Sequence, residues 1–320
     1  MILAYHRVAQ TPTDPQLLCV SPRHFAEQLQ VLRRRRRPMR LLDLASSLRE
    51  GAAPDDAVVI TFDDGYADNL HNAAVLLVAN DVSAAVFVSP GESGAVGEFW
   101  WDELDRLLLQ PGSLPRILRL EIDGQAREWD LGDAAEYSQA DFEKHRAWSV
   151  LRAEAPTPRQ SAYRSLHQAL RPLATAARQA AIASLRAWAG ATPTMRPTHA
   201  RLTPAEIARL AETGVEVGAH TLTHPVLSAT PVEEQRAEIQ RSKERLGDIL
   251  GRPVRSFAYP YGTRKDYTAE TVEIVRQAGF TCACSNFPGE VRADTDLFQL
   301  PRTLVRDWDG DEFAQRILSD

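Results

Sequence analysis

The chain has 320 residues, with 37 lysines and arginines against 43 aspartates and glutamates, so its formal net charge is −6. This length can bury a large core in one barrel-sized domain or in two smaller ones, and the acidic balance argues against a general nucleic-acid binder. The three cysteines, Cys19, Cys282 and Cys284, form no Cys-x-x-Cys pair, so neither a disulfide framework nor a thiolate zinc site is expected.

The amino terminus already has the composition of a strand. It lacks the basic region, the longer apolar region and the small-residue cleavage site of a signal peptide. No stretch of about 20 apolar residues could span a bilayer. We therefore expect a soluble, cytoplasmic protein without a transmembrane segment, or a secreted one if a leader has been removed.

Strands and helices alternate in the first part of the chain, as in a parallel sheet or barrel. Ser21 and Pro22 supply an N-cap and a first-turn proline for a helix over 24–32. The five arginines 33–37 that follow are interpreted as a solvated face rather than as a phosphate or membrane patch. The other expected elements are strand 2–5, helix 41–49, strand 57–61, helix 68–79 and strand 84–88.

This alternation breaks at about residue 97 and resumes at about residue 199. The segment 97–198 is richer in tryptophan, arginine and proline, and it holds five of the six tryptophans. We predict that it forms a lid or subdomain inserted into the main fold, with a hairpin-like piece, 118–131, and a helical stretch, 163–188. Trp100 and Trp101 either contact a sugar or pack the insertion onto the main fold.

After the insertion the alternation continues to the end of the chain, without an internal repeat. Cys282 and Cys284 occupy alternate positions of a strand, so both should face one side of it. The fold class is therefore α/β, with one domain over 1–320 interrupted by the insertion. The expected elements are helix 205–212, strand 215–218, helix 231–250, strand 256–259, helix 268–278, strand 280–284, strand 298–301 and helix 312–318.

Strand 57–61 leads directly into two adjacent carboxylates, Asp63 and Asp64, followed by Gly65. Two like charges side by side repel, and each costs free energy when it is desolvated. A metal ion reverses that cost, because one carboxylate can ligate the ion while the other acts as a base beside it. Taken alone, an acidic turn that closes a strand is the simpler interpretation.

Two further strand ends carry unusual residues. His220 and His224 follow strand 215–218 with a spacing that lets two imidazoles converge on one ion. Two imidazoles and one carboxylate leave open positions on the ion for water and substrate. Because the working residues of α/β barrels lie at the carboxyl ends of strands, these signals together predict one metal site. The third strand end is Tyr259-Pro260-Tyr261-Gly262.

These three motifs resemble those of the polysaccharide deacetylases, carbohydrate esterase family 4, also called the NodB-homology domain. Thr61-Phe62-Asp63-Asp64-Gly65 matches the first family motif, and His220-Thr221-Leu222-Thr223-His224 matches the second. Phe257-Ala258-Tyr259-Pro260-Tyr261-Gly262 resembles the third. The resemblance covers roughly 1–96 and 199–320 and implies a distorted (β/α), TIM-like barrel. The Tyr5-His6 opening resembles the branch that deacetylates biofilm poly-N-acetylglucosamine.

The resemblance implies a metal-binding hydrolase of carbohydrate metabolism that acts on non-peptide C–N bonds. Its product would be acetate and a free sugar amine, from an N-acetylated sugar in a glycan or glycan precursor. Asp64, His220 and His224 would bind a divalent cation, Zn²⁺ by preference and Co²⁺ or Ni²⁺ as alternatives. Asp63 would be the base that deprotonates the water bound to that ion.

The third motif implies an oxyanion site. The backbone N–H of Tyr261, which follows Pro260, would help to hold the tetrahedral oxyanion. Thr221 and Thr223 would position the histidines or their loop. Trp308 either lines the sugar groove or packs at the carboxyl terminus.

The chain departs from the family pattern in two places. Many members carry an arginine in the third motif that steers the base, and here that place is taken by Ala258. Arg302 is the candidate substitute, with Arg255 as the reserve, and an ordinary surface salt bridge is the alternative for each. The family's late histidine, the usual general acid, is also missing, because no histidine follows His224.

His6 follows the first strand and would point to the same barrel mouth. A histidine suits acid work near neutral pH, so we predict that His6 is the general acid, with a capped structural histidine as the alternative. The remaining histidines are expected to be structural or solvent-facing: His24, His71, His145, His167 and His199.

Two other functions stay open at this point. One is a deacylase of another small amide, or of a lipid- or nucleotide-linked sugar. The other is a non-catalytic glycan-binding protein with a relic site, which the two departures permit, although such a protein would not need Asp63. The sequence identifies neither the sugar, nor the native metal, nor the oligomeric state.

Overall fold

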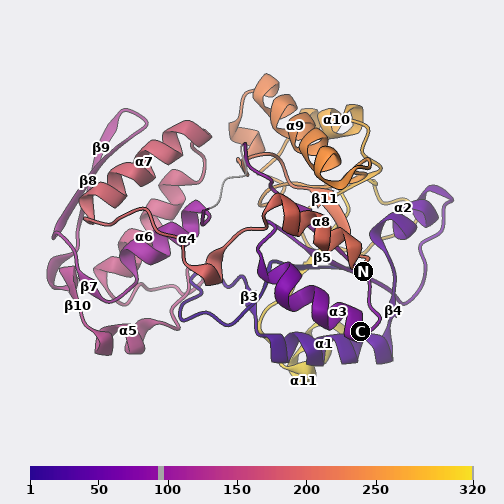
Figure 1. Cartoon of the computed structure of the whole chain (residues 1–320), viewed down its shortest axis with the longest axis horizontal. Coiled ribbons are helices and arrows are strands. Elements are labelled where there is room, and N and C mark those ends of the chain that lie inside the picture. Colours follow the sequence, from indigo (N-terminus) through magenta and orange to yellow (C-terminus); the bar gives the residue numbers. More distant parts are fainter. Residues whose placement is uncertain (93–96, 319–320) are drawn as a thin grey trace. The chain divides into compact units, whose positions relative to one another are not determined.

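The computed structural model describes residues 1–92 and 97–318, which divide into two compact units (Figure 1). The first unit comprises Met1–Gln10, Leu18–Val96 and Ala200–Asp320. The second comprises Thr11–Leu17 and Gly97–His199. A short segment near the amino terminus thus belongs to the same unit as residues that come some 80 positions later, which the sequence did not indicate.

The first unit is built on a parallel sheet with the strand order β13-β12-β11-β6-β5-β1-β14, and β4 pairs with β5 beside this path. Every residue of β1, β5, β6, β11, β12 and β13 is buried, as in parallel sheets that are covered on both faces. The strands are β1 Ile2–Tyr5, β4 Arg37–Pro38, β5 Ala57–Phe62, β6 Ala84–Val88, β11 Glu216–Ala219, β12 Ser256–Ala258, β13 Cys282–Cys284 and β14 Thr303–Leu304.

The last part of the chain joins the two edges of this sheet. The Leu300 N–H donates to the Ala283 carbonyl at 2.9 Å, on the β13 edge. Directly afterwards, β14 pairs with β1, where Thr303 lies opposite Leu3. The sheet therefore curls into the distorted (β/α) barrel that the sequence predicted. The expected strand over 298–301 was displaced, because Pro301 has no N–H to donate to a ladder and the regular pairing begins after it.

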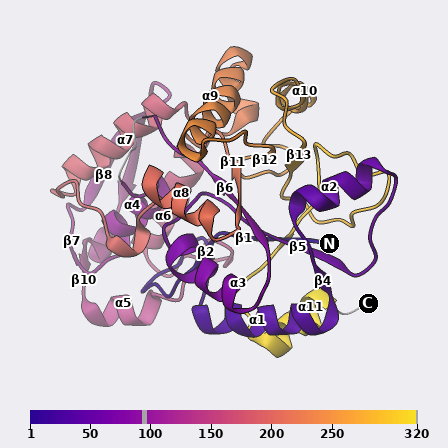
Figure 2. The same ribbon diagram turned by 45° about the vertical axis from the view of Figure 1, so that its right-hand side comes forward.

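Helices cover the outside of the sheet (Figure 2). Helix α8 packs against α9, α9 against α10, and α1 against α11. The helix predicted over 68–79 is present but is not α-helical throughout. Its first part, Asn69–Ala74, is a π-helix, and only Val75–Ala79 is an α-helix. The helices are α1 Pro22–Arg35, α2 Leu41–Arg49, α3 Val75–Ala79, α8 Pro204–Glu212, α9 Val232–Leu250, α10 Ala269–Gln277 and α11 Gly310–Leu318, and β2 Arg7–Val8 pairs with β3 Cys19–Val20.

Alternate strand residues fill the inside of the barrel and form one apolar cluster with side chains of α2. Gly218 leaves the space that the Phe87 ring occupies, since a Cβ at this position would lie 2.5 Å from Phe87 Cδ1. The strand residues of the cluster are Ile2, Val59, Ala85, Phe87, Ala258, Cys282 and Cys284, so both cysteines face the interior, and those of α2 are Leu41, Leu44, Ala45 and Leu48.

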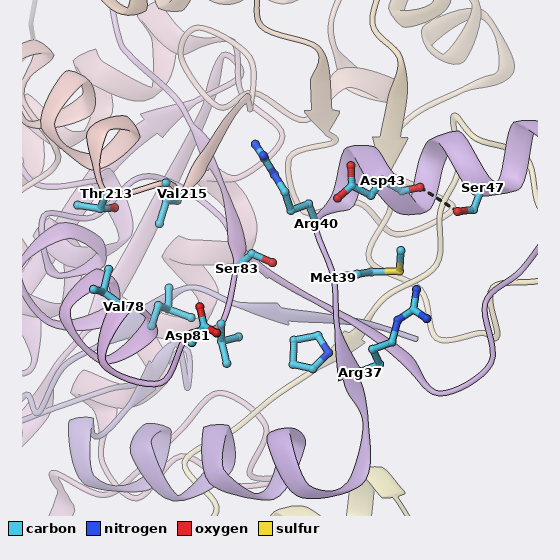
Figure 3. A pocket seen from close by; sticks show the side chains of 14 residues that line it. Arg37, Met39, Arg40, Asp43, Ser47, Val78, Asp81, Ser83, Thr213 and Val215 are labelled. Atoms are coloured by element: carbon cyan, nitrogen blue, oxygen red, sulfur yellow. Dashed lines mark hydrogen bonds between the residues drawn. The ribbon is translucent and has the colours of Figure 1, made fainter.

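Helix α2 lies at the end of the barrel where the strands begin. A groove at this end is lined on one side by Arg37 and Arg40, and on the other by residues that precede β6 and β11, such as Asp81 and Thr213 (Figure 3). Glu216, the first residue of β11, is buried here and accepts a hydrogen bond from the Ser256 hydroxyl at 2.5 Å. Since α2 covers this end, the predicted site residues must work at the opposite, carboxyl end of the strands.

The second unit consists of helices and a hairpin. Its hairpin, β8 Ile117–Ile122 and β9 Gln125–Asp130, turns through Asp123 and Gly124, whose positive φ angles suit a two-residue turn. The single helical stretch expected over 163–188 was wrong, because Pro172 cannot continue a helix and separates α6 from α7. The other elements are α4 Trp100–Leu108, β7 Gly112–Ser113, β10 Glu136–Tyr137, α5 Gln139–His145, α6 Pro158–Leu170 and α7 Thr175–Trp188.

Tryptophans help to build the core of this second unit. Trp101 is buried and stacks on Phe99, with their ring centroids 4.5 Å apart. Trp100 stacks on His167 at 4.8 Å. Both indoles therefore have a packing role within their own unit. In the described residues of the whole chain, no helix is both long and apolar enough to cross a bilayer.

Candidate metal centre

Three predicted ligands converge at the carboxyl ends of β5 and β11. The Oδ1 atom of Asp64 lies 3.6 Å from Nε2 of His220 and 3.2 Å from Nε2 of His224. All three side chains are buried, and their ligand atoms lie within 4.8 Å of one another. Within residues 1–92 and 97–318, no other group of three or more potential histidine, cysteine or acidic ligands gathers in this way.

Sharp backbone turns bring these ligands together. Asp64, Thr221 and His224 all have positive φ angles, of 74°, 61° and 60°, a conformation that costs free energy in residues other than glycine. Gly65 has φ 84°, and a Cβ there would lie 2.9 Å from the Cγ1 atom of Val88, so glycine is required on both counts. The glycine of the first motif thus allows the chain to turn directly after the two carboxylates.

The orientation of His220 is set by a hydrogen bond. Its Nδ1 lies 2.7 Å from the Ala258 carbonyl, which can only accept, so Nδ1 carries the proton and Nε2 offers a lone pair towards Asp64. Burial lowers the pKa of His220 to about 4, so the ring is neutral near pH 7, as a metal ligand must be.

The donor set fits a divalent cation. Burial raises the pKa of the Asp64 carboxyl, which means that the folded chain alone disfavours its charge. A cation held between Asp64, His220 and His224 would remove that penalty. Two imidazole nitrogens and one carboxylate oxygen are ligands that Zn²⁺ accepts while it keeps an open position.

The second carboxylate of the first motif is held by an arginine. Arg302 donates from Nη1 to Oδ1 of Asp63 at 2.7 Å and from Nη2 to Oδ2 at 2.6 Å, and both side chains are buried. Two further bonds fix the guanidinium, from Nε to the Ser285 carbonyl at 2.7 Å and from Nη1 to the Thr61 hydroxyl at 3.0 Å. Its carbon lies 5.6 Å from the centre of the Phe87 ring inside the barrel.

This pairing determines the charge of Asp63. Burial by itself would raise the pKa of the carboxyl, but the charge of Arg302 outweighs that effect, and the pKa lies well below its usual range. Asp63 is therefore ionised at every pH at which the protein would work. Its two oxygens keep lone pairs that are not used by Arg302.

His6 and Tyr261 lie near these groups. The charges of Asp64 and Asp63 act on the His6 ring, although burial of the ring has the larger effect and lowers its pKa. The Asn69 side-chain amide donates to the His6 carbonyl at 2.8 Å and holds the chain after β1. The Tyr261 ring lies 4.8 Å from the His224 ring, and Pro260 before it is buried.

Two further candidates from the sequence lie in the first unit. Trp308 packs against the apolar core, and the guanidinium of Arg316 lies 5.2 Å from its ring. The neighbouring Asp307 accepts a hydrogen bond from the Ser21 backbone N–H at 2.8 Å, so this stretch serves the start of α1. Arg255, the reserve for Arg302, is exposed and precedes β12, at the end of the barrel away from Asp63.

Two features beside the site were not predicted from the sequence. Arg7 donates to Asp68 at 3.0 Å, which ties the segment after His6 to the loop of the first motif. Glu238 of α9 accepts three hydrogen bonds from the loop between the two histidine ligands. No local pattern marks these residues, because each acts through a partner that is distant in sequence.

Comparisons with known proteins show what the chain is similar to. Residues 165–283 match the family model described as polysaccharide deacetylase. That match includes the histidine motif, whose two histidines lie with Asp64 of the aspartate motif. Part of the chain is thus similar to the polysaccharide deacetylases. Among curated proteins, the putative polysaccharide deacetylase YxkH of Bacillus subtilis (strain 168) is 24% identical over 104 residues, which make up 32% of this chain and 36% of that protein. The chain thus matches little more than a third of that relative's length.

Solved structures of deacetylases share the fold of this chain over nearly its whole length. Streptococcus pyogenes PplD, solved in complex with acetate, has a TM-score of 0.60 at 17% identity and covers 100% of this chain and 97% of its own. IcaB from Ammonifex degensii has a TM-score of 0.56 at 19% identity, over 98% and 93%. The BpsB deacetylase domain from Bordetella bronchiseptica has 0.51 at 16%, over 95% and 94%. At these identities the likeness concerns the fold.

Proposed function

We propose that this chain is a member of the polysaccharide deacetylase family and a metal-dependent hydrolase that removes N-acetyl groups from an N-acetylated sugar in a glycan or glycan precursor. The observation that carries the proposal is that two neighbouring aspartates have different partners. Asp64 lies with two histidine nitrogens, as a ligand would, and Asp63 lies beside it in an ion pair with Arg302. The match of residues 165–283 to the polysaccharide deacetylase model supports the carbohydrate substrate.

Asp64, His220 and His224 would hold the cation, for which Zn²⁺ is the first candidate and Co²⁺ and Ni²⁺ are alternatives. When bound, a divalent cation polarises the amide carbonyl and lowers the pKa of water. Asp63, which is ionised and fixed by Arg302, would take the proton from the attacking water. The water oxygen then forms a bond to the acetyl carbon, and the C–N bond breaks as the amine nitrogen gains a proton.

The oxyanion needs a hydrogen-bond donor, and the leaving amine needs a proton donor. The backbone N–H of Tyr261 would donate to the oxyanion, since the positive φ of this residue turns the peptide after Pro260. The charges of both carboxylates favour the protonated form of His6, and in that form His6 would give the proton to the leaving nitrogen. Acetate and a free sugar amine are the products.

Replacing His6 by glutamine is expected to lower kcat by about 10²–10⁴-fold, because a positioned acid contributes that much to a rate. The metal content should stay at the wild-type level, since His6 is not one of the three ligands. Glutamine replacement of His71, whose ring is half-exposed and bonded to Glu206, is the matched control. Turnover by the His6 variant at the wild-type rate would remove His6 from the site.

The test of the function combines metal analysis of the purified protein with an assay of released acetate. The panel contains free, nucleotide-linked and polymeric N-acetyl sugars, with poly-N-acetylglucosamine as the first polymer because of the Tyr5-His6 opening. We expect one metal ion per chain and acetate release that stops on chelation and returns with Zn²⁺. Release from a small amide but from no sugar would favour the general deacylase. Stoichiometric metal without any acetate release would favour the glycan-binding protein.

A further inference from the structure

The loop between the two histidine ligands is held by a carboxylate from another element. Glu238, in the first half of α9, accepts hydrogen bonds through Oε2 from the backbone N–H groups of Leu222 and Thr223, both at 2.8 Å. Its Oε1 accepts from the Thr223 hydroxyl at 2.7 Å. One side chain thus receives two consecutive backbone donors and a hydroxyl from the middle of the 220–224 motif.

This loop needs such support because its backbone is unfavourable. Thr221 and His224, which flank the two bonded residues, both have positive φ angles. Within the loop, the Thr221 hydroxyl accepts the His224 N–H at 3.1 Å, and the Gly91 N–H donates to the Leu222 carbonyl at 2.9 Å. Without Glu238, the N–H groups of Leu222 and Thr223 would lose this charged acceptor, and the strained conformation would lose its support.

The carboxylate of Glu238 serves this loop alone. It is partly buried, and burial raises its pKa. In the part of the chain that the structure describes, Glu238 forms no ion pair. A partly buried carboxylate without a counter-charge costs free energy, and the three loop donors offset that cost.

We propose that Glu238 is a positioning residue of the metal centre. It holds the 220–224 loop so that the Nε2 atoms of His220 and His224 face Asp64 in the free protein, before a cation arrives. Glu238 touches neither cation nor substrate, and the proposal rests on the metal site of the proposed function. Preorganised ligands bind a metal more tightly because less conformational entropy is lost on binding.

The test measures Zn²⁺ affinity of the metal-free full chain by calorimetry, with Co²⁺ absorption as a probe of ligand geometry. Glu238→Ala is expected to weaken Zn²⁺ binding by about 10–100-fold, as is usual when a group that orients metal ligands is lost. Its Co²⁺ complex should show a changed d–d spectrum. Glu238→Gln should restore affinity to within a few-fold of wild type, because its amide oxygen can accept both N–H groups. Glu244→Ala, which alters an exposed acid on the same helix, should bind as wild type.

Glu238→Asp keeps the charge but draws the carboxylate back by one methylene, so this variant should also bind Zn²⁺ weakly. It provides the test if the alanine variant does not fold. Wild-type Zn²⁺ affinity in both Glu238→Ala and Glu238→Asp would overturn the role of Glu238 and leave the deacetylase proposal standing. Equal weakening in Glu238→Gln and Glu238→Ala would also overturn it, because the accepted hydrogen bonds would not be the cause. A wild-type chain that binds no Zn²⁺ would overturn the metal site itself.

Discussion

Replacement of Asp63 by asparagine is expected to reduce acetate release by about 10²–10⁴-fold, the usual contribution of a general base. Asparagine has nearly the same shape and can still accept one hydrogen bond from Arg302, but it cannot take up a proton. The three metal ligands are unchanged, so bound Zn²⁺ should remain at one ion per chain. Acetate assays and metal analysis on the same preparation would measure both effects.

The same substitution should also lower the thermal stability of the protein, because the buried Arg302 loses its counter-charge. Circular dichroism at the assay temperature would show that the variant is folded when it is assayed. Asp294→Asn, which alters an exposed acid, is the control and should be fully active. Wild-type turnover by Asp63→Asn would refute the assignment of the base.

The second large effect is expected from Arg302→Leu. Without the guanidinium, burial dominates and the pKa of Asp63 rises, so a larger share of the carboxyl is protonated near neutral pH and cannot act as a base. The rate should fall, and the acid limb of the kcat/KM profile should move to higher pH. Removal of one partner of a buried ion pair should cost about 3–5 kcal/mol of folding free energy.

The pH dependence of stability follows from the same pairing. In the wild type, the pKa of Asp63 in the folded state lies below its unfolded value, so the pair stabilises the protein above the usual carboxyl range. That contribution is lost as the pH falls through the lowered pKa, and Arg302→Leu should lack it. Arg302→Lys keeps the charge but not the two parallel hydrogen bonds, so its acid stability and its acid limb should lie between those of the wild type and of Arg302→Leu. Arg292→Leu, at an exposed pair with Glu290, is the control. An acid limb that does not move would show that Arg302 does not set the pKa of Asp63.

The parts of the site that the sequence revealed are those encoded locally. Asp63 and Asp64 directly follow a strand, and His220 and His224 follow another, so a strand pattern and a short spacing were enough to predict that they meet. Family resemblance supplied their separate roles. Arg302 was identified only because the third motif lacks its arginine, and the structure shows it bonded to Asp63.

Residues that act through distant partners could not be predicted in this way. Glu238 lies in a charged helix whose surface carries many acids, and only the folded loop makes it different from Glu244. The Arg7–Asp68 pair is hidden for the same reason. Pro172 could have indicated the break between α6 and α7, because a proline is a local signal. The membership of Thr11–Leu17 in the second unit has no such signal, because it depends on tertiary contacts.

The guanidinium that pairs with Asp63 comes from the segment that closes the barrel, 239 positions later in the chain. A nascent chain that has not yet emerged as far as residue 302 can complete the ligand set of Asp64, His220 and His224, but not the ion pair. Its Asp63 would then be a buried acid with a raised pKa. On the proposed roles, a chain that stops short of Arg302 would hydrolyse its substrate more slowly, even with its cation in place.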